Sequence, residues 1–299
     1  MMAHILVRAA LLVCVLLLAP REAATQWFKY PMPGVPRDPG GALDVKAPPP
    51  RTADGKPDFS GVWLGDNPLP CPPIMRDGND CIEKIPLPAR AANIAFGLAG
   101  GLPYQPWAAE LVTQRAATDT RDDPHAKCLP SYVPRNYTLP HYQKFFQSPG
   151  VLLMLNEFNA SYRQIFIDGR PLPVDPQPSW NGYSTARWDG EALVIETTGF
   201  RDDLWLDMLG NPLTSAARVT ERLTRPEFGR LNVELTVDDP KAYTRSWTVR
   251  LTQTFAVDVE LVEEISSRGP QADALSRDAG PRSSRSPPPV AGDQNGEYY

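Results

Sequence analysis

The sequence predicts a mainly β protein whose strands form an antiparallel meander and close into a barrel. Three observations support this fold class. Proline supplies 34 of the 299 residues, about twice its usual share of ~5%, and it interrupts helices and central strands. After Gly150, short apolar or alternating runs follow one another with short connections. Asp189-Gly190 lies between two such runs and is a strong hairpin signal. Closing the meander removes its exposed edges.

The individual elements follow from local composition. The first candidate strand is 58–63, an alternating run, and 107–117 is the one segment with helical composition, just after Pro106. The segment 122–140 is predicted to be irregular because it is rich in proline. The remaining candidate strands are 151–158, 161–168, 184–188, 191–197, 219–225, 231–237, 243–251 and 255–265.

Composition divides the chain into four parts. Residues 1–24 are interpreted as a signal peptide, because Arg8 precedes an apolar run, Ala9–Ala19, that is too short to cross a ~30 Å hydrocarbon core. Residues 25–57 are predicted to be a Pro-rich extended arm, 58–265 a single β-rich domain, and 266–299 a disordered tail. The mature protein is therefore expected to be secreted or periplasmic, without a stable membrane span.

The net charge and the cysteine content limit the classes of partner and metal that the protein is expected to bind. A net charge of −5 and a pI near 5.3 give no electrostatic footprint for nucleic acid. In an oxidising compartment Cys71 and Cys81 are predicted to form a disulfide that closes a short loop. The loop contains no His, so zinc is the weaker alternative. Cys128 is left without a partner.

Strand alternation places two charges on inward faces. Glu221 shares its face with Val219 and Leu223, and Arg245 shares its face with Tyr243 and Trp247. One interpretation is a buried ion pair between Glu221 and Arg245, which is the commoner arrangement. The other is a ligand clamp or a general acid with a shifted pKa.

The other candidates are an acid and a group of aromatics. Asp207 ends the segment 200–207, in which acids flank Trp205; either a solvated surface or a polar-ligand site explains that composition. The aromatics predicted to contact a ligand or fill the core are Trp63, Trp188, Trp205, Tyr243 and Trp247.

The sequence contains no strong motif for metal binding or for nucleophilic catalysis. His125 and His141 lack the spacing of a metal motif, so we predict no metal site and no cofactor. The sequence contains no GxSxG, Walker or GxGxxG motif.

Several motifs together resemble a family of secreted bacterial proteins of unknown function. They span residues 54–265 and include DGKPDFSGVW, YRQIFIDGRPLP, DPQPSWNGYSTARWDGEALVIETTGF and LTVDDPKAYTRSWTV. The resemblance implies no established activity. Members tend to end in Cys-His-Glu-Gly, where this chain has Ser266-Ser267-Arg268-Gly269. We therefore hypothesise that the tail results from a frameshift. Separately, Gly61-Val62-Trp63 is similar to the Gly-x-Trp of lipocalin-like (calycin) barrels, in which an Arg from a late strand covers the Trp.

Three functions fit these patterns. The favoured one is a β-barrel that binds a small, partly apolar molecule. The first alternative is an exported hydrolase, lyase or isomerase that uses Glu221 or Asp207 in acid–base chemistry, with Arg245 stabilising charge. The second is a structural envelope protein, for which the Pro-rich arm is the only support.

Overall fold

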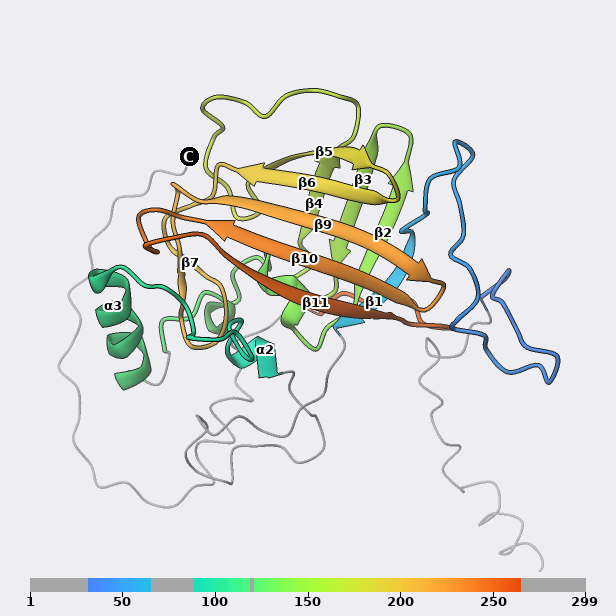
Figure 1. Cartoon of the computed structure of the whole chain (residues 1–299). Coiled ribbons are helices and arrows are strands. Elements are labelled where there is room, and N and C mark those ends of the chain that lie inside the picture. Colours follow the sequence, from blue (N-terminus) through green and yellow to red (C-terminus); the bar gives the residue numbers. More distant parts are fainter. Residues whose placement is uncertain (1–31, 66–88, 119–120, 265–299) are drawn as a thin grey trace, which may run out of the picture. The chain divides into compact units, whose positions relative to one another are not determined.

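The computed structural model describes residues 32–65, 89–118 and 121–264, and nine of the strands in these ranges form a closed barrel (Figure 1). Around the barrel the order is β1-β11-β10-β9-β6-β5-β4-β3-β2. Their bounds are β1 Gly61–Gly65, β2 Gln143–Ser148, β3 Val151–Asn156, β4 Tyr162–Phe166, β5 Tyr183–Asp189, β6 Ala192–Thr198, β9 Arg218–Glu227, β10 Arg230–Asp238 and β11 Trp247–Phe255.

Neighbouring barrel strands pair antiparallel, with one exception. β1 closes the ring by pairing with β11 on one side and β2 on the other. β4 and β5 are parallel and share only the pairs Ile165–Ser184 and Phe166–Thr185. The predicted mainly β fold and its closure are thus confirmed, while a purely antiparallel meander is not.

Besides shifts of one to three residues at several strand ends, two larger differences separate the structure from the sequence prediction. β2 lies in a stretch, 143–148, that we did not assign as a strand. The predicted strands at 243–251 and 255–265 merge into one strand that begins at Trp247 and ends at Phe255. The segment after it, 256–264, forms no strand and makes only an isolated parallel bridge between Glu264 and Phe158.

The barrel interior is filled with apolar side chains. Along β9 and β10 every second residue is buried, as expected for strands with one face toward a core. Buried residues from strands on opposite sides of the barrel belong to one hydrophobic cluster that includes Phe145, Leu152, Ile165, Leu193, Leu223, Leu231 and Val249.

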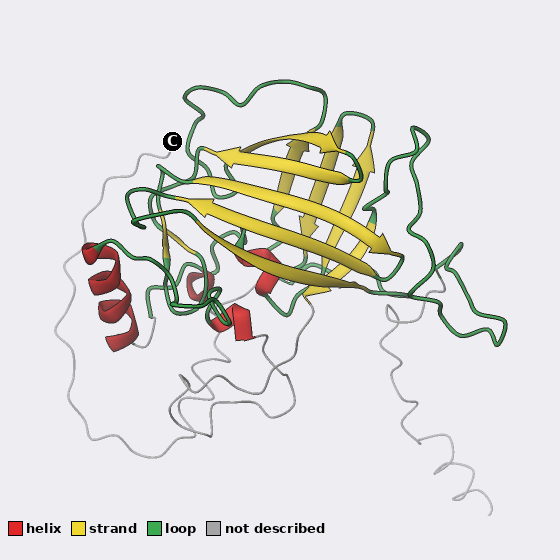
Figure 2. Ribbon diagram, viewed as in Figure 1, coloured by secondary structure: helices red, strands yellow, loops and turns green. Residues whose placement is uncertain are grey.

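Helices and a small second sheet gather at one end of the barrel (Figure 2). They are α2 Ala89–Ala92, α3 Pro106–Ala117, the 3-10 turns η1 His125–Lys127 and η2 Arg135–Thr138, and the pair β7 Leu204–Trp205 with β8 Pro212–Leu213. α3 confirms the predicted helix at 107–117, with Pro106 in its first turn. None of the helices in the described ranges is long and apolar enough to cross a membrane.

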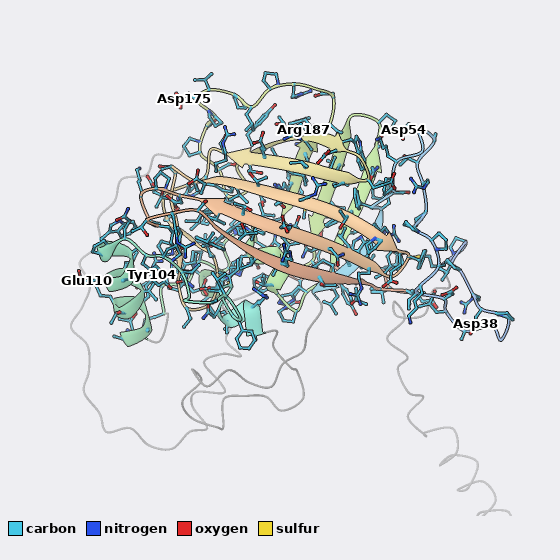
Figure 3. The ribbon with its side chains drawn as sticks, in the orientation of Figure 1. Asp38, Asp54, Tyr104, Glu110, Asp175 and Arg187 are labelled. Atoms are coloured by element: carbon cyan, nitrogen blue, oxygen red, sulfur yellow. The ribbon has the colours of Figure 1, made fainter. Side chains whose placement is uncertain are left out.

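The segment 32–60 forms loops at the end of the barrel that carries the β5–β6 and β9–β10 turns, where the Phe228 and Gly229 amides donate to the Ala47 and Val45 carbonyls (Figure 1). Its turns carry Asp38 and Asp54 outward (Figure 3), and Arg51 forms an ion pair of 2.8 Å with Glu191 beside the β5–β6 turn. The predicted signal peptide, the Cys71–Cys81 disulfide and the tail 266–299 lie outside the described residues. Cys128 is a free thiol.

The expected cover over Trp63 is present. Trp63 is fully buried, and the guanidinium carbon of Arg225, on β9, lies 4.8 Å from the centre of its ring. Arg225 also donates hydrogen bonds to the carbonyls of Asp58 and Phe228. Gly61 has φ +135°, and a Cβ there would overlap the Phe255 ring, so the glycine is needed where β1 and β11 approach. In these respects the barrel is compatible with a lipocalin-like fold in coarse terms; lipocalins have eight strands.

Candidate functional site

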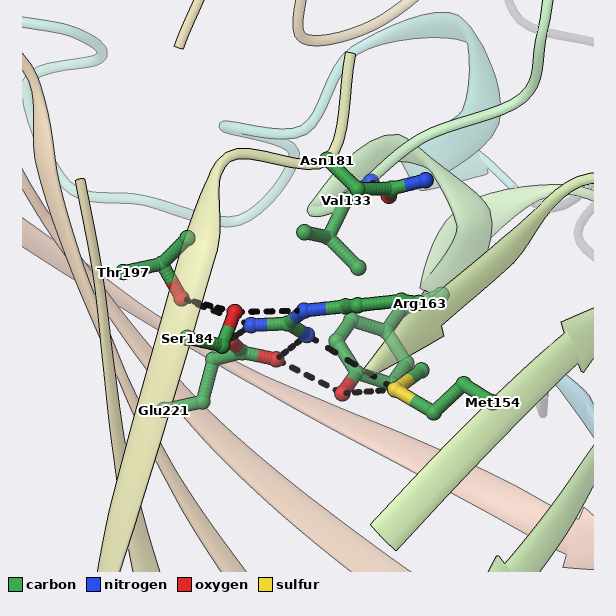
Figure 4. A network of polar contacts seen from close by, with 8 residues as sticks. Val133, Met154, Arg163, Asn181, Ser184, Thr197 and Glu221 are labelled. Carbon is green, nitrogen blue, oxygen red and sulfur yellow. Dashed lines mark hydrogen bonds and ion pairs between the residues drawn. The ribbon is translucent and has the colours of Figure 1, made fainter. Parts of the chain in front are cut away.

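A buried polar network lies on the inner face of the barrel, centred on Arg163 of β4 and Glu221 of β9 (Figure 4). The two side chains are 1% and 0% exposed and form a bidentate ion pair, with Nη1–Oε1 at 3.0 Å and Nη2–Oε2 at 2.5 Å. The hydroxyl of Tyr137 donates to the same carboxylate at 2.6 Å. A charge pair this far from water persists only when its remaining donors and acceptors are also satisfied.

The strands between β4 and β9 satisfy those donors. Arg163 donates from Nε to Ser184 Oγ on β5 at 3.0 Å and from Nη2 to Thr197 Oγ1 on β6 at 2.7 Å. Ser184 and Thr197 are opposite each other in the β5–β6 register. One guanidinium therefore links four consecutive strands. Burial opposes its charge, but the adjacent Glu221 carboxylate raises the pKa of Arg163 above its ordinary value.

The predicted partner of Glu221 was wrong. Arg245 is exposed and lies before β11 begins, because the chain from Asp239 to Ser246 is a loop and does not continue the strand alternation. Glu221 itself is buried as predicted. Its actual partner, Arg163, lies in the predicted strand 161–168 on the same face as Ile165, and that alternation was the available signal.

A groove opens beside this network, where β4 and β5 separate. The parallel strands share two residue pairs and then diverge toward Tyr162 and Ser179. The Asn181 side chain bridges the gap, donating to the Tyr162 carbonyl at 3.1 Å and accepting from the Val133 amide at 3.0 Å. The groove has a volume of about 480 Å³, within the range of small-molecule sites. It is called the β4–β5 groove below.

Aromatic side chains and polar groups share the lining of the β4–β5 groove. Tyr162 is 63% exposed, whereas Trp180 is half-buried and stacks on Tyr132 at 5.6 Å between ring centres. The Phe166 and Tyr183 rings lie 5.3 Å apart. Arg163 and Ser184, both buried in the network, also line the groove, together with Gln164 and Asn181. The groove thus combines aromatic faces with hydrogen-bonding groups held in fixed positions.

A second hollow, of about 650 Å³, lies between the β4–β5 connection and residues 215–218. The connection carries Asp175 outward (Figure 3), and the lining is mostly proline and small residues. Arg218, its one cation, already pairs with Glu196 at 3.1 Å. This hollow offers fewer groups that could orient a ligand than the β4–β5 groove does.

Asp207 lies elsewhere, in the capped end of the barrel. Its carboxylate is fully buried and accepts hydrogen bonds from the Ile94 amide at 2.8 Å and from the Asn211 side chain at 2.5 Å. The Tyr104 hydroxyl donates to Asn211 in turn. Burial raises the pKa of Asp207 above its ordinary value, against the opposing effect of these donors. Through these hydrogen bonds Asp207 connects the segment that follows α2 to the β7–β8 turn, and its side chain has no contact with solvent.

We predict that Asp207→Asn lowers the free energy of unfolding by about 1–3 kcal/mol, although it removes a buried charge. The substituted amide NH₂ would face either the Ile94 amide or the Asn211 amide, and it cannot accept a hydrogen bond from either. Urea denaturation checks this value. Asp203→Asn is the control, since Asp203 is exposed, and an equal loss in both variants would contradict the explanation.

The five predicted aromatics do not form one site. Trp205 and Tyr243 lie near Asp207, and the Tyr243 ring packs edge-on against Trp247 at 5.6 Å. Trp63 is in the core beneath Arg225. Trp188 stacks on Phe59 at 5.8 Å, next to the segment before β1. None of the five lines the β4–β5 groove; sequence analysis missed the groove residues Tyr162 and Trp180.

No protein-family model matches the chain, and no curated protein matches it.

Proposed function

We propose that this protein is an exported β-barrel that binds a small, partly apolar molecule in the β4–β5 groove. The observation that carries the proposal is the groove itself, about 480 Å³ in volume, with aromatic side chains around buried polar groups. The apolar run near the N-terminus and the resemblance to secreted bacterial proteins support export. The Arg225 cover over Trp63 supports the lipocalin-like character of the barrel.

The lining defines the kind of ligand that fits. Tyr162 offers a ring face for a flat apolar group, while Trp180, whose ring contacts Tyr132 and the Arg201 guanidinium, adds apolar lining. Gln164 offers an amide donor and acceptor, and Asn181, whose Nδ2 already donates to the Tyr162 and Ser131 carbonyls, offers the second lone pair of its Oδ1. Ser184 lies deeper, bonded to Arg163. A planar molecule of modest size, with one or two polar substituents, would use both features. Such sites are typically mostly apolar, with a few placed polar groups.

The geometry gives less support to the exported enzyme. Glu221 and Asp207 are both 0% exposed, and the donors around each carboxylate hold it in place. Arg245, the proposed charge stabiliser, is exposed and in a different part of the chain from the Glu221 network. A substrate would have to displace buried, satisfied groups to reach either acid. Binding requires no such rearrangement.

We predict that Tyr162→Ala weakens ligand binding about fivefold, because stacking on an aromatic ring contributes about 1 kcal/mol. The probe is a panel of planar phenols and aromatic amides, assayed by ligand-observed NMR. Phe146→Ala is the matched control, since Phe146 is also a strongly exposed aromatic, on β2 and outside the groove. If no panel member binds, or if binders respond equally to both variants, the groove is not the site.

A further inference from the structure

Three side chains from separate parts of the chain meet next to the turn between β3 and β4. His141 precedes β2, Glu157 follows β3, and Glu264 lies in the segment after β11. Each residue offers one ligand atom, which is an imidazole nitrogen for His141 and a carboxylate oxygen for each Glu. These three atoms all lie within 4.8 Å of one another. His141 Nδ1 is 3.1 Å from Glu264 Oε2. Segments far apart in sequence thus bring an imidazole and two carboxylates together.

Backbone hydrogen bonds hold the three segments in this arrangement. The Glu157 amide donates to the Tyr142 carbonyl at 3.0 Å, and the Glu264 amide donates to the Glu157 carbonyl at 3.0 Å. The Asn159 amide donates back to the Glu264 carbonyl at 2.6 Å. The His141 ring stacks on Phe158 at 4.6 Å between ring centres, which sets the direction of its nitrogens. The fold therefore fixes the backbone that carries the three donor side chains, as well as the plane of the His141 ring.

We propose that His141, Glu157 and Glu264 form a binding site for a first-row divalent transition-metal cation such as Zn²⁺. Imidazole and carboxylate are both ligands of Zn²⁺, which often takes three protein ligands and a water molecule. Ca²⁺ and Mg²⁺ prefer oxygen ligands alone. Ligand atoms at ~2.1 Å from one ion lie at most about 4.2 Å apart. The present spread of up to 4.8 Å is wider than this, so metal binding would require a small rotation of the Glu264 side chain, which is 53% exposed.

The electrostatics of the cluster favour a cation. The Glu157 and Glu264 carboxylates repel each other, and the His141 imidazole can supply at most one positive charge to offset that repulsion. A divalent ion would neutralise both acids at once.

A metal bound at this site would cross-link two segments of the chain. It would join the segment after β11 to the turn that follows β3, and residues 159–161 of that same turn line the β4–β5 groove. An ion that binds only the folded arrangement stabilises it by mass action. Metal binding would therefore fix both the C-terminal segment and one wall of the groove.

Zinc titration of the full-length, chelator-treated protein by isothermal calorimetry tests the site. We expect one Zn²⁺ per chain, with binding at least tenfold weaker in Glu264→Gln and in Glu157→Gln. Glu260→Gln is the matched control, because Glu260 lies on the same segment and pairs with Lys144 at 3.0 Å; its binding should equal that of the wild type. Unchanged binding in Glu264→Gln and Glu157→Gln, or no binding by the wild type, would overturn the proposal.

A second measurement separates this site from zinc bound by cysteine. Co²⁺ held by nitrogen and oxygen shows only weak visible bands, whereas thiolate coordination adds intense charge-transfer absorption. We expect the weak bands alone, together with slower hydrogen exchange over 256–264 after Co²⁺ addition. Thiolate absorption, or exchange in this segment that does not respond to the metal, would place the ion elsewhere.

Discussion

Arg163→Met is expected to lower the free energy of unfolding by about 3–5 kcal/mol, because it leaves the Glu221 carboxylate buried without its counter-charge. Four hydrogen bonds to Glu221, Ser184 and Thr197 are lost with the guanidinium. Only Tyr137 would still donate to the acid. Equilibrium denaturation in guanidinium chloride measures the loss, and Arg187→Met, which truncates an exposed arginine on β5 (Figure 3), should change stability by less than about 0.5 kcal/mol.

The double variant Arg163→Met with Glu221→Leu should be much more stable than Arg163→Met alone. Replacing a whole buried ion pair by apolar groups of similar volume is often neutral, whereas removing one partner is not. The residual loss should come from Ser184 and Thr197, which keep only each other as partners in the network, and from the buried Tyr137 hydroxyl, which loses its carboxylate acceptor. If the single and double variants lose equal stability, the two charges are not coupled as the geometry indicates.

Acid should destabilise the protein through His125. Its imidazole is buried between Tyr132 and Phe158, its Nε2 has no partner among the described residues, and Arg135 lies close. Burial, with a smaller effect of Arg135 and His141, lowers its pKa to about 2 from 6.5. The unfolded chain therefore binds a proton that the folded chain does not, and stability falls as pH drops below about 6.5.

The expected loss from this one group at two pH units below its unfolded pKa is about 2.7 kcal/mol. Asp123, which pairs with Arg135 at 2.6 Å, also faces the site. Because both proteins contain this ion pair, the difference in unfolding free energy between wild type and His125→Phe measures the contribution of the imidazole. Urea denaturation from neutral to acid pH should show a shallower decline in His125→Phe. His141→Gln, measured in chelator-treated protein, is the control for the other imidazole and should change the slope much less than His125→Phe, since His141 has only a small effect on the His125 pKa. Parallel curves for wild type and His125→Phe would rule out the assignment.

Strand alternation predicted the buried acid but not its partner. Glu221 lies within a long regular strand, so its inward orientation follows from Val219 and Leu223 on the same face. Arg245 precedes the start of β11, and a loop does not preserve the two-residue period. The charge on Arg163 was visible in the sequence, but its distance from Glu221 depends on β5 and β6 lying between their strands, which local pattern does not determine.

The β4–β5 groove could not be predicted from the sequence either. It exists because β4 and β5 are parallel and pair over only two residues, whereas hairpin signals predict antiparallel neighbours. The long connection 167–182 contains four prolines and returns the chain to the start of β4. Gly182 has φ +62°, and a Cβ there would lie 2.6 Å from the Thr198 carbonyl oxygen. That backbone requirement is invisible without the coordinates.

A crystal structure of the protein soaked with planar aromatic fragments would show whether the β4–β5 groove binds ligands. We expect fragment density in the groove, against Tyr162 and Trp180 and within hydrogen-bond distance of Asn181, beside an intact Arg163–Glu221 pair. Fragments that bind only elsewhere, or a groove filled by the protein's own side chains, would contradict this expectation.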